Sequence, residues 1–267
     1  MNCQFRRRRA APFWIATAAL AVAAPAFLHA QGRGGRGGFG PPRSPQAGAP
    51  IDLTGYWVAL VTEDWRWRMV TPPKGDVASV PLNAEGRRVA NEWDPDKDIA
   101  AGEQCKAYGA AGIMRVPTRL HITWENENTL RLDTDAGTQT RLFHFGMPSP
   151  GGEPTWQGYS EAQWEVAGGR GGFGGFGRGG PPAGGSLKVV TTHMRPGYLR
   201  KNGVPYSGNA TVTEYFDRTM EPDGSSYLIV TTIVEDPQYL TQPFITSTHF
   251  KRQADASGWN PTPCEAK

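Results

Sequence analysis

A chain of 267 residues is long enough to bury one sizeable hydrophobic core, so one domain with appendages is expected. Its formal charge of +3 includes the four arginines at positions 6–9, and without them the charge is −1. The rest of the chain therefore lacks the excess positive charge of a nucleic-acid-binding surface, and no nucleic-acid partner is predicted.

The first thirty residues have the pattern of an export signal. The basic positions 6–9 precede an apolar stretch at 13–28, which is too short to span a bilayer comfortably. Cleavage after Ala26 or after Ala30 fits the local pattern, and we predict a signal peptide over residues 1–30. The mature protein is then expected to be soluble, to have no membrane anchor, and to be periplasmic or extracellular.

Two segments are too rich in glycine to build a core. Residues 31–50 are predicted to be a disordered Gly/Pro/Arg-rich linker, which places the folded domain at residues 51–267. Their RGG repeats also occur in RNA-binding segments, but an exported protein meets little RNA, which favours a solvated tether. Residues 168–185 are predicted to be a Gly-rich loop insertion without the strand and helix that flank a phosphate-binding loop. No nucleotide site or other cofactor is predicted.

Order is expected to begin with a strand over residues 52–61. Gly55 and Trp57 near its start form a Gly-x-Trp triplet, which resembles the signature of the lipocalin (calycin) superfamily. The resemblance implies that this Trp packs across the closed end of a β-barrel.

Residues 64–69 alternate aromatic and basic side chains. As a strand, they would present Trp65 and Trp67 on one face and Arg66 and Arg68 on the other. Two interpretations fit this pattern, an amphipathic edge strand and an aromatic wall that binds a ligand.

Helix-forming residues follow. A helix is predicted over residues 82–93 with Asn83 as its N-cap, and a second short helix over residues 98–108. Cys105 and Cys264 are the two cysteines that remain after signal cleavage. In an oxidising compartment they are predicted to form a disulfide, although two free thiols are the alternative.

Three short strands with turns between them are predicted over residues 119–125, 129–134 and 139–145, as in a barrel or sandwich. Charged side chains alternate with leucine and isoleucine along them, which gives a charged face made of Arg119, His121, Arg131, Asp133 and Arg141. This face is either wet, as antiparallel sheets commonly allow, or it points into the barrel and marks a functional site. The general rule for antiparallel sheets favours the wet face.

The stretch from residue 187 to residue 250 contains four runs rich in Val, Ile, Thr, Tyr and Phe, separated by turn residues. This pattern predicts consecutive antiparallel strands. His193 lies at the end of one strand, and the polar residues 195–209 after it are expected to form a lid over one end of the barrel. Tyr198 belongs to this lid.

Glu214 shares its strand face with Val212 and Phe216, so its carboxylate is expected to face a mainly apolar surface. Such a group needs a partner or a raised pKa. An ion pair with Arg141 or Arg195 is one interpretation, and a role as a general base is the other.

The four histidines that remain after cleavage do not have the spacing of metal ligands. We expect each to be a hydrogen-bonded strand residue, and no metal site is predicted. These histidines are His121, His144, His193 and His249.

Several motifs in the C-terminal half, taken together, resemble those of a widespread family of uncharacterised exported bacterial proteins. The resemblance implies a lipocalin-type barrel and carries no established activity. The Gly-rich insertion after Glu165 departs from the family pattern. The residues that carry the resemblance are Gly158, Ser160, Trp164 and Glu165; Leu187, Val189 and Thr191; Asn202, Gly203, Pro205 and Ser207; Glu214, Phe216 and Arg218; and Asp236, Pro237, Tyr239, Pro243 and Phe244.

The sequence thus predicts a mainly β fold, a single antiparallel calycin/lipocalin-like barrel with a short helical segment and Gly-rich disordered insertions. Its expected role is to bind a small apolar or aromatic molecule in the barrel mouth. The aromatic wall is predicted to be Trp65, Trp67 and Tyr215, and the polar orienting groups to be Arg119, His121, Arg141, His193 and Arg195.

Two alternatives stay open. In the first, the cavity belongs to a cofactor-independent lyase, isomerase or hydrolase, with His193 or Glu214 as base and Tyr198 with an arginine stabilising negative charge. In the second, the barrel is filled with side chains and the protein is a structural or surface-interaction module. The ligand and the oligomeric state are not specified by the sequence.

Overall fold

The computed structural model describes residues 43–149, 151–166 and 184–267. The predicted signal peptide, residues 31–42 of the predicted linker and most of the Gly-rich insertion lie outside the described residues. Among the helices that are described, none is both long and apolar enough to cross a membrane.

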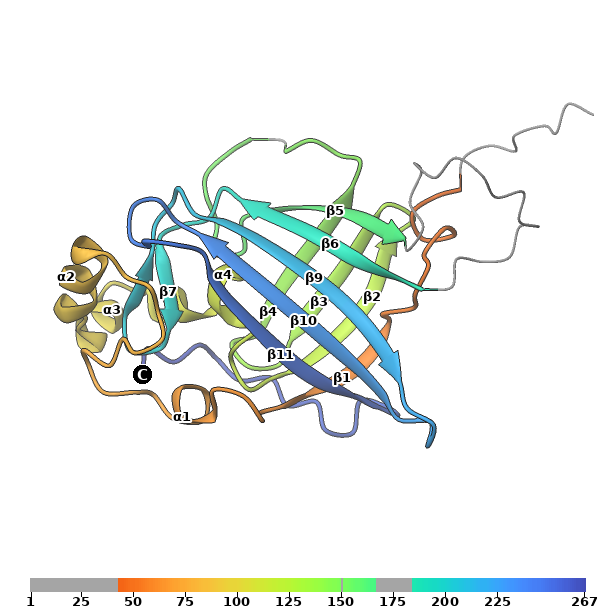
Figure 1. Ribbon diagram of the computed structural model, residues 1–267, viewed down its shortest axis with the longest axis horizontal. Coiled ribbons are helices and arrows are strands. Elements are labelled where there is room, and N and C mark those ends of the chain that lie inside the picture. Colours follow the sequence, from red (N-terminus) through yellow and green to blue (C-terminus); the bar gives the residue numbers. More distant parts are fainter. Residues whose placement is uncertain (1–42, 150, 167–183) are drawn as a thin grey trace, which may run out of the picture. The chain divides into compact units, whose positions relative to one another are not determined.

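Nine strands form a closed β-barrel, with neighbours in the order β1-β11-β10-β9-β6-β5-β4-β3-β2 and β2 returning to β1 (Figure 1). The mainly β barrel that the sequence predicts is therefore present. The strands are β1 (Gly55–Leu60), β2 (Arg119–Asn126), β3 (Thr129–Thr134), β4 (Gln139–Phe145), β5 (Tyr159–Val166), β6 (Gly185–Thr192), β9 (Thr211–Met220), β10 (Ser226–Glu235) and β11 (Phe244–Gln253).

The barrel is not purely antiparallel, which corrects the prediction. β4 and β5 pair in parallel, with Phe143 opposite Ser160 and Phe145 opposite Ala162, whereas the other neighbouring strands of the ring pair antiparallel. The reason is the connection over residues 146–158. It returns the chain to the end at which β4 began, so that β5 runs in the same direction as β4.

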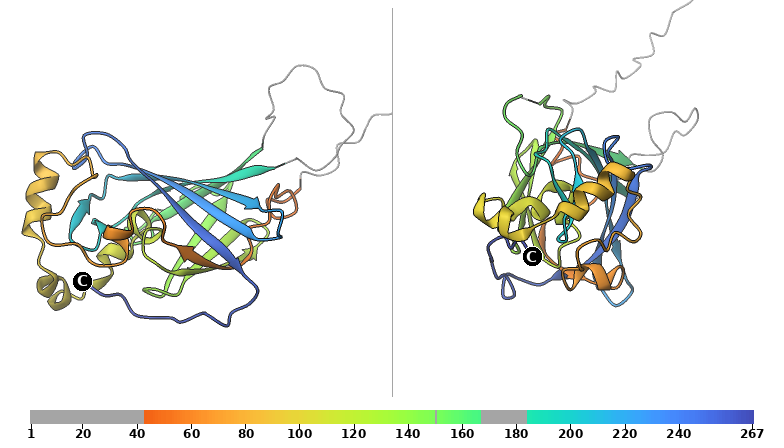
Figure 2. Two further views of the ribbon diagram at one scale, coloured as in Figure 1. Left: turned by 60° about the horizontal axis from the view of Figure 1, so that its bottom comes forward. Right: turned by 90° about the vertical axis from the view of Figure 1, so that its left-hand side faces the viewer.

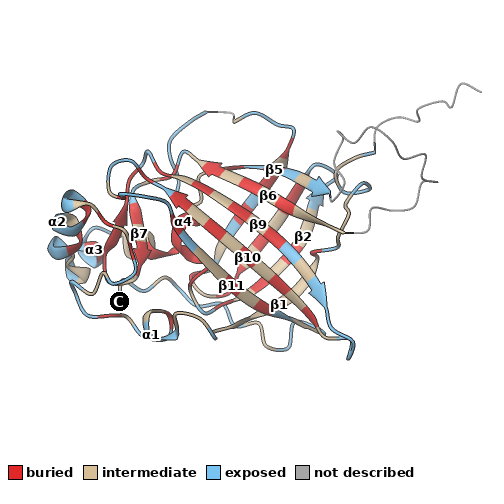
Figure 3. Cartoon of the chain, viewed as in Figure 1, coloured by how far each residue is buried: buried red, intermediate tan, exposed pale blue. Residues whose placement is uncertain are grey.

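Alternation of buried and exposed residues along each strand places the core inside the barrel (Figure 3). On β2 and β3 the leucines and isoleucine point inward, and Arg119, His121, Arg131 and Asp133 are only partly buried on the outside. The wet-face interpretation therefore holds for these two strands. It fails on β4, because there Arg141 is buried and Leu142 is exposed.

Helices and a hairpin gather at one end of the barrel (Figure 2). We call this end the cap. Its elements are α1 (Trp65–Arg68), α2 (Ala84–Glu92), α3 (Pro95–Ala100), the 3-10 helix η1 (Gln104–Tyr108), α4 (Ala110–Ile113), and the paired strands β7 (Gly197–Arg200) and β8 (Val204–Tyr206).

Helix α2 confirms the predicted helix and its N-cap, because the Asn83 side chain accepts a hydrogen bond from the Gly86 backbone N–H at 2.8 Å. The second predicted helix is split into α3 and η1. The split falls at Gly102, whose positive φ of 70° is not helical.

The strand predicted over residues 64–69 is wrong, because this segment is the single-turn helix α1. Asp64, in a left-handed conformation, starts the turn, and the Met69 backbone N–H donates to the Trp65 carbonyl. A helical turn does not place Trp65 and Trp67 on one face. Trp65 is 65% exposed, and the Arg68 side chain is buried.

The segment 195–209, predicted to be a polar lid loop over one end of the barrel, does lie at one end, but it is mainly a packed hairpin and not a loop. Most of it is buried in the β7–β8 hairpin, where Leu199, Val204 and Tyr206 pack in a small apolar cluster with residues of α2 and α4. We call this the cap cluster. The larger barrel cluster fills the other part of the interior and contains the fully buried Trp57.

Candidate functional site

The residues predicted to form a site do not come together in one place. Two of them, Arg141 and Glu214, meet inside the barrel, four lie on the outside of the barrel strands or at their ends, and four lie in or beside the cap. Arg119, His121, His193 and Tyr215 are the outer group, and Trp65, Trp67, Arg195 and Tyr198 are the cap group.

Arg141 and Glu214, which we call the interior pair, form a bidentate salt bridge with side chains that are 0% exposed. The Arg141 Nη1 donates to Glu214 Oε1 at 3.0 Å and its Nη2 to Oε2 at 2.5 Å. Nη2 also donates to the hydroxyl of Thr191 at 3.3 Å, and this hydroxyl bonds to Ser160 at 2.8 Å. The ion pair with Arg141 is thus the observed state of Glu214, and both carboxylate oxygens are engaged.

The interior pair lies between the two apolar clusters. Along β9, Glu214 follows Val212 of the cap cluster and precedes Phe216 of the barrel cluster, and all three are fully buried. A charged pair between two apolar clusters is tolerated because each charged group lies within hydrogen-bonding distance of the oppositely charged one. It acts here as an internal polar layer of the barrel.

Three residues of the outer group, His121, Arg119 and His193, each have a local partner. His121 stacks on Tyr56 with ring centroids 4.1 Å apart, and Arg119 Nη1 lies 3.4 Å from Asp135. The exposed His193 has a positive φ of 55°, and its Nδ1 is 3.0 Å from the Thr192 hydroxyl. These contacts give the residues a structural role at the barrel surface or at the end of a strand.

Two residues of the cap group are held by acidic side chains. The Tyr198 hydroxyl donates to Asp98 Oδ2 at 2.8 Å, and burial together with this hydrogen bond raises the pKa of Tyr198. Arg195 donates to Glu103 at 3.0 Å. Neither contacts His193 or Glu214 by a hydrogen bond among the described residues, so the proposed catalytic side chains have separate partners.

A cleft of about 380 Å³ opens at the cap end of the barrel, lined by residues of α1, α4, β7 and the segment after β11. Its walls combine apolar and cationic side chains. They include Trp67, Arg68, Met69, Val70, Arg115, Val116, Leu199, Arg200, Thr262 and Glu265.

Three buried arginines from distant parts of the chain line this cleft, which we call the arginine cleft. Arg68 ends α1, Arg115 follows α4, and Arg200 ends β7. Arg68 Nε donates to the Arg115 carbonyl at 2.8 Å, and Arg200 Nη1 donates to the Ala78 carbonyl at 2.7 Å. These backbone contacts fix the positions of two of the guanidinium groups.

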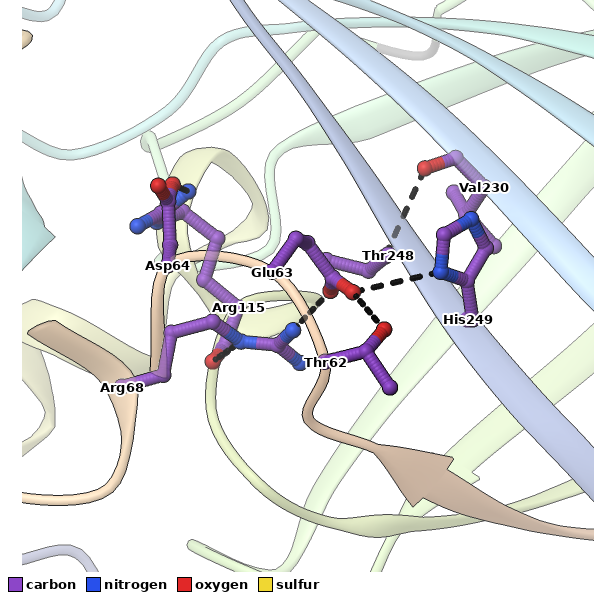
Figure 4. A network of polar contacts seen from close by, with 8 residues as sticks. All are labelled: Thr62, Glu63, Asp64, Arg68, Arg115, Val230, Thr248 and His249. Carbon is purple, nitrogen blue, oxygen red and sulfur yellow. Dashed lines mark hydrogen bonds and ion pairs between the residues drawn. The ribbon is translucent and has the colours of Figure 1, made fainter. Parts of the chain in front are cut away.

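Carboxylates of the loop before α1 hold two of the arginines, as Figure 4 shows. Arg68 Nη1 donates a hydrogen bond to Glu63 Oε1, and Arg115 Nη1 donates one to Asp64 Oδ2 at 2.9 Å. Glu63 is held in turn by the Thr62 hydroxyl at 2.7 Å and by His249 Nδ1 at 3.2 Å. The network therefore continues from the cleft to the outer side of β11.

Four guanidinium nitrogens of the cleft are buried without a hydrogen-bond acceptor among the described residues. They are Nη2 of Arg68, Nη2 of Arg115, and Nε and Nη2 of Arg200. Burial lowers the pKa of Arg68 and lowers that of Arg200 to about 10, and in both the nearby charge of Arg115 lowers it further. The three arginines that line the cleft therefore have buried donors without acceptors among the described residues, and their positive charges lie close to one another.

Trp67 provides the aromatic wall. The guanidinium carbon of Arg200 lies 4.7 Å from the centre of the Trp67 ring, and Trp67 Nε1 donates to Asp76 at 3.2 Å. Met69 and Val70, 58% and 65% exposed, form an apolar rim beside it. Trp67 is thus the one residue of the predicted aromatic wall that lines the arginine cleft.

A disulfide holds one side of the cleft. Cys105 of η1 is bonded to Cys264, as the sequence predicts, and this fixes the segment after β11 that contributes Thr262 and Glu265. Thr262 is also bound through its backbone N–H, which donates to the Asp135 carbonyl at 2.9 Å. The wall therefore depends on a covalent bond that lies beside Gln139, the first residue of β4.

Comparisons with known proteins give no family: no family model, no curated protein and no solved structure matches this chain. Nor is there, within the described residues, a group of three or more His, Cys, Asp or Glu side chains placed to hold a metal ion.

None of the three cleft arginines is among the predicted site residues, and Arg115 lies outside every predicted element. It lies in an irregular segment between α4 and β2, where no periodicity applies. Each of the three arginines directly follows an apolar or aromatic residue, but so does Arg66, whose side chain is 63% exposed, so this placement does not identify them.

Proposed function

We propose that this protein binds a small molecule with an apolar or aromatic body in the arginine cleft. The observation that carries the proposal is the cleft itself, because its volume of about 380 Å³ is within the range of small-molecule sites and Trp67 forms one wall. The apolar rim of Met69 and Val70 extends this wall toward the opening. Binding at the cap end also agrees with the barrel-mouth location expected for a calycin-like protein.

The cleft is favoured over the barrel interior as the binding place. Inward-facing residues such as Phe143, Phe216 and Phe250 are fully buried and belong to one packed cluster. The interior pair lies next to this cluster, and the charges of Arg141 and Glu214 already neutralise each other. A ligand therefore finds available surface at the cap.

Export of the protein belongs to the same proposal. The disulfide between Cys105 and Cys264 is compatible with an oxidising compartment, which the signal-like sequence of residues 1–30 also favours. A secreted or periplasmic calycin-like barrel that binds a small molecule is the interpretation that unites the barrel, the disulfide and the cleft.

Fluorescence titration with the neutral probe N-phenyl-naphthylamine tests the binding function. We expect saturable binding that weakens about tenfold or more in Trp67→Ala, because the ring that forms the wall is lost. Trp65→Ala is the matched control, since Trp65 lies on the same helix, is 65% exposed and is not part of the cleft lining. Its affinity should equal that of the unmodified protein.

Melting temperatures of the two variants show whether each is folded. Equal affinities of Trp67→Ala and the unmodified protein would place the probe elsewhere and overturn the arginine cleft as the binding place. Native mass spectrometry of protein from its own source gives an independent check, because a retained small molecule should be lost from Trp67→Ala.

A further inference from the structure

Charge in the arginine cleft is only partly balanced by the protein. Arg68 is paired with Glu63 and Arg115 with Asp64. Arg200, in contrast, has no carboxylate within salt-bridge distance among the described residues, and its one hydrogen bond goes to the backbone of Ala78. The third guanidinium is therefore buried with a peptide carbonyl as its only hydrogen-bond partner in the described part of the chain.

Unused donors make this arrangement costly for the free protein. A buried N–H without an acceptor loses its hydration and gains nothing in return, and the penalty is larger for a charged group. The four unpartnered nitrogens come from the three arginines that line one cleft. An acceptor from outside the chain would remove this penalty.

The arrangement is also built to stay in place. Glu63 and the Arg115 carbonyl both bind Arg68, and Asp64 binds Arg115 (Figure 4). Trp67 lies against Arg200. Arginines held in this way lose little freedom when a ligand binds, which favours affinity.

We infer that the ligand of the arginine cleft carries an oxyanion head group, a carboxylate, sulfonate or phosphate, bound by Arg68, Arg115 and Arg200 with its apolar or aromatic body against Trp67. This inference rests on the proposed function and names its ligand class.

The hydrogen-bonding chemistry of the three guanidinium groups decides the chemical class of the ligand's head group. Guanidinium groups donate hydrogen bonds and accept none, so they cannot bind a metal ion or an ammonium group. Their planar fork matches the geometry of carboxylate and phosphate oxygens. The chain's own carboxylate in the cleft, Glu265, pairs instead with Lys201 at 3.6 Å and is mostly exposed.

A matched pair of probes separates the head group from the body. Anilinonaphthalene sulfonate has the same aromatic body as N-phenyl-naphthylamine and adds one sulfonate. We expect the unmodified protein to bind the sulfonate probe about tenfold or more tightly than the neutral probe, because charge-assisted hydrogen bonds form only with the anion.

Arg200→Gln is the decisive variant. It should remove most of the preference for the sulfonate probe and leave the affinity for the neutral probe within about twofold. Arg88→Gln is the control for a change in net charge, because Arg88 lies on the exposed face of α2 and pairs with Glu85 and Glu92. It should keep the full preference. Arg115→Gln provides a second cleft variant if Arg200→Gln does not fold.

The outcomes distinguish the inference from the proposed function. Equal affinity for both probes would overturn the oxyanion and leave the binding function standing. Absence of binding by both probes would overturn both. A sulfonate preference that persists in Arg200→Gln and Arg115→Gln would show that the anion binds elsewhere, which also overturns the inference.

Competition against the bound sulfonate probe then identifies the head group. Benzoate, benzenesulfonate and phenyl phosphate are the three oxyanion arms, and benzamide is the neutral arm. At least one oxyanion should displace the probe at a concentration about tenfold or more below that of benzamide. Equal competition by all four compounds would contradict a head-group site.

Discussion

Two sets of buried arginines in this barrel differ in how completely the chain itself satisfies them. At the interior pair, Glu214 and Thr191 take up both terminal nitrogens of Arg141, and only its Nε lacks an acceptor among the described residues. At the arginine cleft, three guanidinium groups share two carboxylates and four nitrogens lack acceptors in the same part of the chain. The first arrangement is nearly complete within the protein, and the second would be completed by the oxyanion of the proposed ligand.

Under the proposed function, the difference separates a structural from a functional use of the same side chain. A buried cation that is fully paired contributes to a unique fold, whereas a buried cation with unused donors costs stability. Proteins tolerate such destabilisation at binding sites. Three predictions test this distinction and a fourth concerns another part of the barrel; they are ordered from the largest expected effect to the smallest.

Removal of one member of the interior pair should have the largest effect. Arg141→Met leaves the Glu214 carboxylate buried without its partner, and we expect the free energy of unfolding to fall by about 3–5 kcal/mol. Urea denaturation measures this change. The double variant Arg141→Met/Glu214→Leu should recover most of the loss. A single variant as stable as the unmodified protein would show that the pair does not support the barrel.

Reduction of the disulfide should come next and should affect the cleft more than the interior. Loss of the Cys105–Cys264 bond is expected to lower the free energy of unfolding by about 2–4 kcal/mol. Because this bond holds the segment that contributes Thr262 and Glu265 to the cleft, binding of the sulfonate probe should weaken as well. Cys105→Ser/Cys264→Ser gives the same comparison without reductant. Unchanged probe binding in the folded variant would mean that this wall is dispensable.

Arg200→Met should affect stability in the opposite direction to Arg141→Met. It removes a buried charge that has no carboxylate partner among the described residues, so the free energy of unfolding should stay within about 1 kcal/mol of the original value or increase. Affinity for the sulfonate probe should fall at the same time. Urea denaturation and fluorescence titration on one preparation test both points. A loss as large as that of Arg141→Met would erase the distinction between the two regions.

The smallest expected effect is on the pH dependence of the unfolding free energy. It involves neither of the two arginine regions. Burial lowers the pKa of His144, which stacks on Tyr159, below its ordinary value of 6.5. As the pH falls through 6.5, the unfolded chain takes up the proton first, so this group makes the protein less stable until the folded pKa is reached. His144→Gln should flatten the decline of the unfolding free energy below pH 6.5 in urea denaturation. An unchanged slope would assign the decline to other groups.

Much of the barrel could be predicted from the sequence because strand alternation is a local signal. Leu120, Ile122 and Leu132 alternate with polar residues over several positions, and the structure buries these three. Arg141 breaks this rule, because a charged residue takes an inward position where a partner from β9 is available. Only the pairing of distant strands decides this, although the sequence did indicate Arg141 as one of two possible partners of Glu214.

The cleft could be predicted only in part. Trp67 belonged to the expected aromatic wall, but the four residues of α1 are too few to show helical periodicity, so Trp65 was grouped with it. Arg115 lies in an irregular segment, and Arg200 lies in a segment expected to be a polar lid loop. The three arginines come together through tertiary contacts among the cap elements, which local patterns do not encode.

The parallel pairing of β4 and β5 also has a topological consequence. Strand direction must return to its starting value after one circuit of a closed ring, so the number of antiparallel neighbours must be even. A ring of nine strands therefore always contains at least one parallel neighbour pair, whatever its sequence. Here that obligatory seam spans only three paired positions, fewer than any other interface of the ring, which makes it the line along which the barrel would open first.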